Sequence, residues 1–330
     1  MLMLTVIVAL AALGAIGVAA ASLTFRSLAL RSVLKPSYRR IAYRALTAIG
    51  RNYTGIDLAE WSRTVAIATT QSELRQSCRV LENDAGMRLV ETPLGAFWIP
   101  ETEREGYDGF LLMVAEELNN HYHFEGAAYV LDCGANLGTF TRLALSRGAR
   151  VVVAIEPAPE IVRCLQRTFA QEILLGRVIL VERGLWNRDD RLFLRTSSED
   201  SWNNTIIAHE NGQQGAWVPL TTIDKIVADL NLPSVSFIKM DIEGAEVKAL
   251  DGAKATIRGW KPVIAVATEH TEEKLKNTAD VVAMVKAAGP YSDVCIKGSI
   301  RRTRPLLGVG IPNSVMPEIM LLRPDSASMA

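Results

Sequence analysis

From about residue 105 to the end of the chain, apolar residues follow two alternating patterns. Short apolar runs, typical of buried strands, alternate with stretches in which apolar residues recur every three or four positions, as in amphipathic helices. The alternation predicts an α/β domain with a mostly parallel sheet and helices on both faces. The predicted strands lie at residues 128–132, 150–156, 177–186, 235–241, 261–269, 291–297 and 318–323, with a hairpin near 191–197. The predicted helices lie at 110–118, from the glycine turn to 147, and at 158–173, 221–230, 244–257 and 272–288.

The region before this domain has weaker patterns. Residues 57–84 have helical tendency, and "RLVETPLGAFWIP" (88–100) alternates like a strand pair interrupted by Pro93 and Gly95. Neither stretch contains a recognisable catalytic pattern. We expect this region to cover one side of the main domain.

The first 25 residues contain no charged side chain, and residues 4–25 form an apolar run long enough to cross a bilayer as a helix. We predict a transmembrane anchor. A cleaved signal peptide is the main alternative, and a buried helix is a second one. No Lys or Arg precedes the run, whereas secretory signals normally begin with a basic segment, so the anchor is favoured.

Charge is distributed unevenly along the chain. Residues 26–56 contain seven Lys and Arg and no acid, and the remainder has a net charge of −7. The positive-inside rule then places the rest of the chain in the cytoplasm, as in a single-pass protein of a bacterial inner membrane. A basic amphipathic helix after Pro36 would either lie on anionic headgroups or be solvated. The acidic remainder argues against nucleic acid as a partner.

The glycine turn "DCGANLG" (132–138) follows a predicted strand but is not a dinucleotide fingerprint. Asn136 stands where G-x-G-x-x-G requires its second glycine, between Gly134 and Gly138. Asp132 would repel a pyrophosphate and attract a cation, and Glu156 ends the next strand, where an acid can accept both hydroxyls of a ribose. The pattern therefore predicts a nucleoside with a positively charged amino-acid group, S-adenosylmethionine (SAM).

Four segments together resemble the FkbM family of SAM-dependent methyltransferases. They are "VLDCGANLGTFT", "AIEPAPEIVRCL", "LTTID" and "SFIKMDIEGAEVKALDGA", and the resemblance covers roughly residues 105–300. It implies a class I Rossmann-like fold, with a mostly parallel seven-stranded sheet, and methyl transfer, usually to oxygen. By the same match, the cofactor-binding residues would be Asp132, Gly134, Asn136, Gly138 and Glu156.

The segment "KMDIEG" places two acids at the end of a predicted strand. Methyl transfer to a hydroxyl needs a residue that removes its proton. We assign this role to Asp241 or Glu243, with Asp241 favoured, since Glu243 opens the next predicted helix and could simply complement its N-terminus. His270, after the following strand, is a third candidate because its usual pKa lies near neutrality.

We assign no metal, because the two carboxylates lack an obvious third ligand. The four cysteines are widely spaced and form no CxxC pair, which predicts neither a zinc site nor a disulfide framework.

The sequence thus predicts an anchor (1–25), a basic juxtamembrane helix with an accessory segment (26–104) and a methyltransferase domain (105–325). The predicted activity is O-methylation of a sugar, glycan or related metabolite at the membrane. The D/N-P-P-Y/F motif typical of amine methylation is absent, which favours oxygen. Two alternatives stay open: an NAD-dependent sugar oxidoreductase and a non-catalytic SAM-binding membrane protein.

Overall fold

The computed structural model describes residues 58–101, 104–120, 122, 129–195, 215–267, 274–306 and 309–324, some of them by their backbone alone. The predicted anchor (1–25), the predicted basic helix after Pro36 and His270 lie outside these residues. Among the helices that are described, none combines the length and the apolar character needed to cross a membrane.

The chain divides into two compact units, of which the larger contains Val65–Lys297 and Pro317–Ala330. The smaller contains Met1–Thr64 and Gly298–Met316, and its described part is backbone from one helix and two strands. The larger unit includes every residue of the candidate site.

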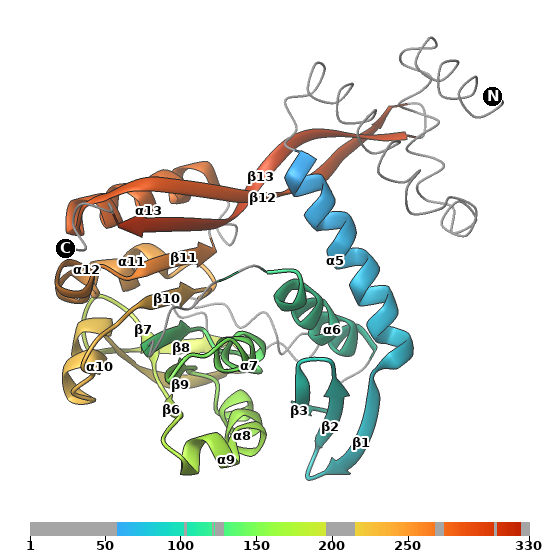
Figure 1. The fold of residues 1–330 in the computed structure, drawn as a ribbon, viewed down its shortest axis with the longest axis horizontal. Coiled ribbons are helices and arrows are strands. Elements are labelled where there is room, and N and C mark those ends of the chain that lie inside the picture. Colours follow the sequence, from blue (N-terminus) through green and yellow to red (C-terminus); the bar gives the residue numbers. More distant parts are fainter. Residues whose placement is uncertain are drawn as a thin grey trace. The chain divides into compact units, whose positions relative to one another are not determined.

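Helix α5 (Leu58–Ser77) and a three-stranded antiparallel sheet precede the main domain (Figure 1). The predicted strand pair is β2 (Met87–Thr92) and β3 (Gly95–Pro100). The helical tendency predicted through residue 84 is wrong for strand β1 (Arg79–Asp84), where all six side chains are exposed and leave no strand-like alternation to detect. Strand β3 lies against the main domain, where Trp98 N donates a hydrogen bond of 2.9 Å to Thr168 Oγ1.

The main sheet has seven strands, as predicted, and four consecutive pairs in it are parallel. Only β13, among the strands whose pairing is described, runs antiparallel to its neighbour, β11. The strand order is β12 (Tyr291–Leu306), β13 (Val309–Pro324), β11 (Val263–Ala267), β10 (Phe237–Met240), β4 (Tyr129–Cys133), β5 (Val151–Ile155) and β6 (Val178–Val181).

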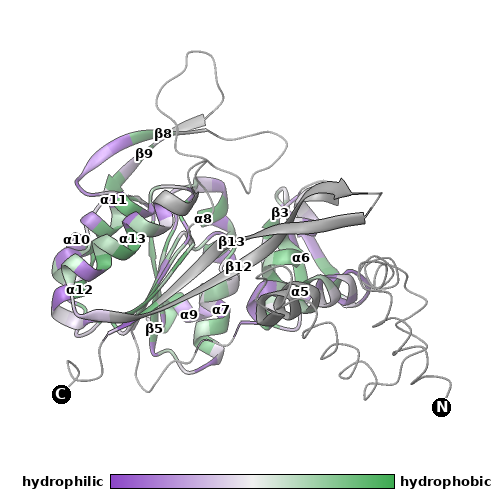
Figure 2. Ribbon diagram, turned by 90° about the horizontal axis from the view of Figure 1, so that it is seen from above, coloured by the Kyte–Doolittle hydropathy of each residue, from purple (hydrophilic) through white to green (hydrophobic). Residues whose placement is uncertain are grey.

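Helices cover both faces of this sheet (Figure 2). Alternate strand residues point to opposite faces, so Val130 packs with α6, α7 and α8, whereas Leu131 packs with α10 to α13. The helices on the first face are α6 (Arg104–Leu118), α7 (Thr139–Ser146) and α8 (Pro159–Thr168). Those on the second are α10 (Ile223–Asp229), α11 (Glu246–Asp251), α12 (Lys254–Trp260) and α13 (Lys274–Ala288). The two apolar cores confirm the predicted layers.

Two of the predicted helices are each interrupted. The helix predicted at 158–173 consists of α8 and a short α9 (Ala170–Leu174), and the one at 244–257 consists of α11 and α12. The second break lies at Gly252, where an added Cβ would come within 2.3 Å of the backbone oxygen of Trp186. Close packing against Trp186 therefore accounts for the glycine at this break.

A small second sheet follows β6. Its order is β7 (Gly184–Leu185), β9 (Gly215–Thr221) and β8 (Asp190–Arg195). Strand β8 coincides with the predicted hairpin segment and pairs with β9 in antiparallel fashion.

The strand order changes direction at β4. From β4 the chain proceeds through β5 and β6 on one side and later returns to β10 and β11 on the other. In open parallel sheets, ligands bind outside the carboxyl ends of the strands at such a switch point. The position expected for a site is therefore the end of β4 and β10.

Candidate functional site

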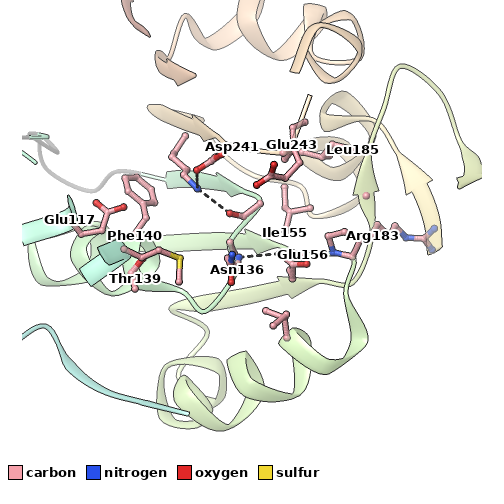
Figure 3. Close-up of a pocket in the computed structure, with 18 of the residues that line it drawn as sticks. Glu117, Asn136, Thr139, Phe140, Ile155, Glu156, Arg183, Leu185, Asp241 and Glu243 are labelled. Carbon is pink, nitrogen blue, oxygen red and sulfur yellow. Dashed lines mark hydrogen bonds and ion pairs between the residues drawn. The ribbon is translucent and has the colours of Figure 1, made fainter. Parts of the chain in front are cut away.

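A cavity opens at this switch point (Figure 3). Its walls come from α6, from the turn between β4 and α7, from the ends of β5 and β10, and from Arg183 with strand β7 of the small sheet. The predicted residues Gly134, Asn136, Glu156, Asp241 and Glu243 all line it, so three segments distant in the sequence meet at one place.

Both glycines of the turn have positive φ angles, 75° for Gly134 and 80° for Gly138, which glycine adopts at low cost. A Cβ on Gly134 would come within 1.9 Å of the backbone oxygen of Asp241, and one on Gly138 within 2.3 Å of the Phe169 ring. Close packing of the turn against β10 and α8 thus accounts for both glycines, without any role in approaching a phosphate.

Asn136 occupies the tip of the turn with a φ of 47°, a left-handed conformation that Asn tolerates better than most residues. Its backbone N–H donates to Glu156 Oε2 at 3.0 Å. Its side-chain Oδ1 is buried and accepts no hydrogen bond. A buried acceptor without a donor is unfavourable, so a ligand that supplies one would be stabilised here.

Glu156 follows β5 directly and lines the cavity while remaining largely buried. Each carboxylate oxygen accepts one backbone N–H: Oε2 from Asn136 at 3.0 Å and Oε1 from Ala158 at 2.9 Å. Burial raises the pKa of Glu156 from its usual 4.5 to about 7, although these two N–H groups act in the opposite direction. Each oxygen retains a lone pair that can accept a hydroxyl.

Asp132 has different surroundings. It is 0% exposed, accepts a hydrogen bond from Thr141 Oγ1 at 2.6 Å and lies 3.7 Å from Lys239 Nζ. Burial raises the pKa of Asp132, and Lys239 and Thr141 offset part of the effect. Asp132 is not among the residues that line the cavity, and its Oδ1, the oxygen nearer Lys239, accepts no hydrogen bond from the described part of the chain.

Lys239 was not among the predicted site residues, yet it lines the cavity and links the two strands at the switch point. Its Nζ donates to the Gly134 oxygen at 3.0 Å and lies 3.5 Å from Asp241 Oδ2. Burial lowers the pKa of Lys239, but nearby carboxylates, Asp241 first, outweigh burial and raise it above its usual 10.5. A lysine within the apolar run "FIKM" is the sequence signal that could have identified it.

The two acids after β10 both line the cavity as predicted, but Glu243 is not at the start of the next helix. Asp241 lines the cavity with its side chain 40% exposed. Glu243 does not open the next helix; it lies in a turn with a φ of 56°, and α11 begins at Glu246. Glu246 is 0% exposed and its Oε1 accepts the N–H groups of Ile242 and Gly244 at 3.2 and 3.1 Å. The carboxylate that complements this helix start is therefore Glu246.

A further acid reaches the cavity from α6, which the sequence patterns did not connect with the site. Glu117 lines the cavity and accepts a hydrogen bond from Asn120 Nδ2 at 3.2 Å. Its only signal in the sequence is a carboxylate within the apolar periodicity of a helix.

The charges around the cavity favour a neutral or cationic ligand. The lining contains five acids and two bases: Glu116, Glu117, Glu156, Asp241 and Glu243 against Arg183 and Lys239. Among the residues whose positions are described, no three His, Cys, Asp or Glu side chains are grouped as a metal site would require.

A family model described as "Methyltransferase FkbM domain" matches residues 132–289. The mostly parallel α/β sheet, with its site at the switch point, is thus the fold of a Rossmann-like methyltransferase. The match confirms the resemblance to the FkbM family that was predicted from the motifs.

Solved structures with a similar fold include a methyltransferase FkbM from Methylobacillus flagellatus, with 18% identity and a TM-score of 0.42. That alignment covers 67% of this chain and 56% of the other, little more than half of its length. A SAM-dependent O-methyltransferase from Thermotoga maritima has 12% identity over 72% of this chain and 77% of its own, with a TM-score of 0.34.

Fibrillarin from Aeropyrum pernix, in complex with natively bound S-adenosyl-L-methionine, has 11% identity over 74% of this chain and 97% of its own, with a TM-score of 0.36. Similarities this distant give no information on the residues of the site. No curated protein matches the sequence.

Proposed function

We propose that this domain binds SAM and methylates a hydroxyl oxygen of a sugar, glycan or related metabolite. The observation that carries the proposal is the position of Glu156. Two backbone N–H groups fix both of its oxygens at the wall of the cavity, directly after β5. A carboxylate held in this way can accept both hydroxyls of a ribose.

The other residues of the cavity fit the same ligand. The excess of acids suits a positively charged nucleoside and would repel a pyrophosphate. The buried Oδ1 of Asn136 offers an acceptor to a polar hydrogen of the ligand. When bound, SAM would supply a methyl group activated by its sulfonium charge.

For the removal of the hydroxyl proton we propose Asp241. It lines the cavity at the end of β10, it is partly exposed, and Lys239 holds it at 3.5 Å. Glu243 lines the same wall and is the alternative. A carboxylate near an acceptor hydroxyl can serve as a general base.

We also propose that the apolar residues 4–25 anchor the protein in a bacterial inner membrane with this domain in the cytoplasm. The support is the apolar run and the basic segment that follows it. Carbonate-resistant sedimentation of the full chain with membranes is expected, and its complete release by carbonate would contradict the anchor.

Calorimetric titration of the full-length chain in mild detergent tests the cofactor. We expect binding of SAM and of S-adenosylhomocysteine, and no binding of NAD. The reverse selectivity would support the oxidoreductase alternative and overturn the proposal.

The Glu156→Gln variant tests the ribose site. Loss of a hydrogen bond to a charged group weakens binding by about tenfold or more, so SAM affinity should fall by at least that factor. The matched control is Glu182→Gln. Glu182 is an exposed acid that follows the neighbouring strand β6 and accepts a hydrogen bond from Gln166. Equal affinities for SAM in the two variants would contradict the role of Glu156.

A further inference from the structure

Glu117 is a buried carboxylate in a helix outside the family match. It belongs to α6 (Arg104–Leu118), whereas the match begins at residue 132. The residue is only 9% exposed, and its neighbours Val114 and Ala115 are part of the apolar core. Acidic side chains are seldom buried to this extent unless they are paired.

The pairing of Glu117 is incomplete. Its one hydrogen bond comes from Asn120, and it takes part in no ion pair within the part of the chain that the structure describes. The charged groups that face it are Lys239 and Asp241 at β10 and Asp132 of β4. Burial raises the pKa of Glu117 from its usual 4.5 to about 7; Lys239 and Asn120 oppose this effect, whereas the two aspartates add to it.

A perturbed carboxylate in a cavity is a candidate for ligand binding. Figure 3 shows Glu117 and Glu156 on opposite sides of Asn136, so they mark separate ends of the cavity. A ligand with its ribose at Glu156 would extend past the glycine turn toward Glu117. In SAM, the part that extends beyond the ribose and the sulfur is an amino acid with an α-ammonium group.

We propose that Glu117 binds the α-ammonium group of SAM. The inference rests on the proposed function, since it takes the ribose to be at Glu156. A cation placed beside Glu117 would form a direct ion pair, which Lys239 faces but does not make among the described residues. The α-carboxylate of the same group would face the first turn of α7, where Thr139 and Phe140 line the cavity and a helix favours negative charge.

Three ligands separate the two ends of the site. SAM and S-adenosylhomocysteine contain both the ribose and the amino-acid group, whereas 5′-methylthioadenosine keeps the ribose and lacks the amino acid. In Glu117→Gln, affinity for the first two should fall by about tenfold or more, and affinity for methylthioadenosine should stay unchanged. Glu156→Gln should weaken all three.

The matched control is Asp108→Asn, which removes a carboxylate from the same helix. Asp108 pairs with Arg75 outside the cavity, so all three affinities should remain at the wild-type level. Unchanged SAM affinity in Glu117→Gln, or an equal loss for all three ligands, would overturn the inference. Absence of SAM binding in the wild-type chain would instead overturn the proposed function.

Proton release gives a second readout. At about pH 7, a carboxyl with a pKa near 7 is protonated in roughly half of the molecules, and binding a cation would displace that proton. Titrations in two buffers of different ionisation enthalpy should show more protons released with SAM than with methylthioadenosine. In Glu117→Gln, whose folding is checked by its thermal transition, this difference should disappear; its persistence would contradict the role of Glu117.

Discussion

The ends of β4 and β5 each place an acid at the same edge of the sheet, yet the two carboxylates have different surroundings. Asp132 is the fourth residue of β4 and contacts Thr141 of α7 and Lys239 of β10. Glu156 comes one residue after β5 and is held by two backbone N–H groups at the cavity wall. Position relative to the strand end therefore separates an enclosed acid from one that a ligand can reach.

The comparison also separates two kinds of energetic contribution. At β4, side chains from neighbouring elements form a small charge network, so its loss should affect folding. At β5, the carboxylate is oriented for a ligand, and burial disfavours its ionised form. The β4 acid should thus matter for stability and the β5 acid for binding.

The largest effect on stability is expected from Asp132→Asn. The change removes a charge that Lys239 and Thr141 contact, and disruption of a buried pair costs about 3 kcal/mol. Urea denaturation near pH 7 would measure the loss, with Asp108→Asn, which alters a partly exposed ion pair, as the control.

A second variant tests whether the charge of Lys239 causes the loss of stability in Asp132→Asn. Lys239→Met added to Asp132→Asn should restore part of the stability, because it removes a buried charge that has lost one of its two carboxylate neighbours and keeps only the partly exposed Asp241. A further loss in the double variant would show that Lys239 contributes to folding independently of Asp132.

The next largest effect is a dependence of stability on pH at Glu156. The pKa of Glu156 is about 7 in the folded protein, whereas the ordinary value of 4.5 applies in the unfolded chain. The folded protein therefore holds the proton more tightly. The free energy of unfolding therefore falls as pH rises from 4.5 to about 7 and stays low above that.

In Glu156→Gln, this fall should be smaller by about 2 kcal/mol between pH values near 5 and near 8. Denaturation curves across that range would measure the difference from wild type. A variant with the wild-type slope would mean that Glu156 is ionised equally easily in both states.

The smallest of these effects is expected from Thr141→Val. The change removes the 2.6 Å hydrogen bond to Asp132 with little change in volume and should cost about 1 kcal/mol. In an Asp132→Asn background its cost should be smaller, as a double-mutant cycle would measure. Additive losses would contradict a direct interaction between the two side chains.

Much of the sheet could be predicted because its signals are local. The apolar runs at β4, β5, β10 and β11 reflect burial on both faces, and the helices between them show their own periodicity. The acids at the strand ends and the glycine turn could be identified for the same reason. Strand β1 had no such signal, because its side chains are exposed.

The site residues that were missed depend on distant contacts. Glu117 lines the cavity only because α6 packs beside β4 and β10, and Glu246 replaces Glu243 at the start of α11 because the chain first turns through a left-handed residue. Nothing adjacent in the sequence distinguishes these acids from solvated ones.

The sequence by itself determined the alternation of strands and helices, the family and the acids at the ends of β4 and β5, since each depends on spacing along a short segment. Only the tertiary structure decided which acid is enclosed and which faces the cavity. Burial and charge at a carboxylate depend on groups far apart in the chain; Lys239 meets the glycine turn across 105 residues. The physical reason is that desolvation and Coulomb interactions depend on distances in space, whereas a periodic pattern depends only on spacing along the chain.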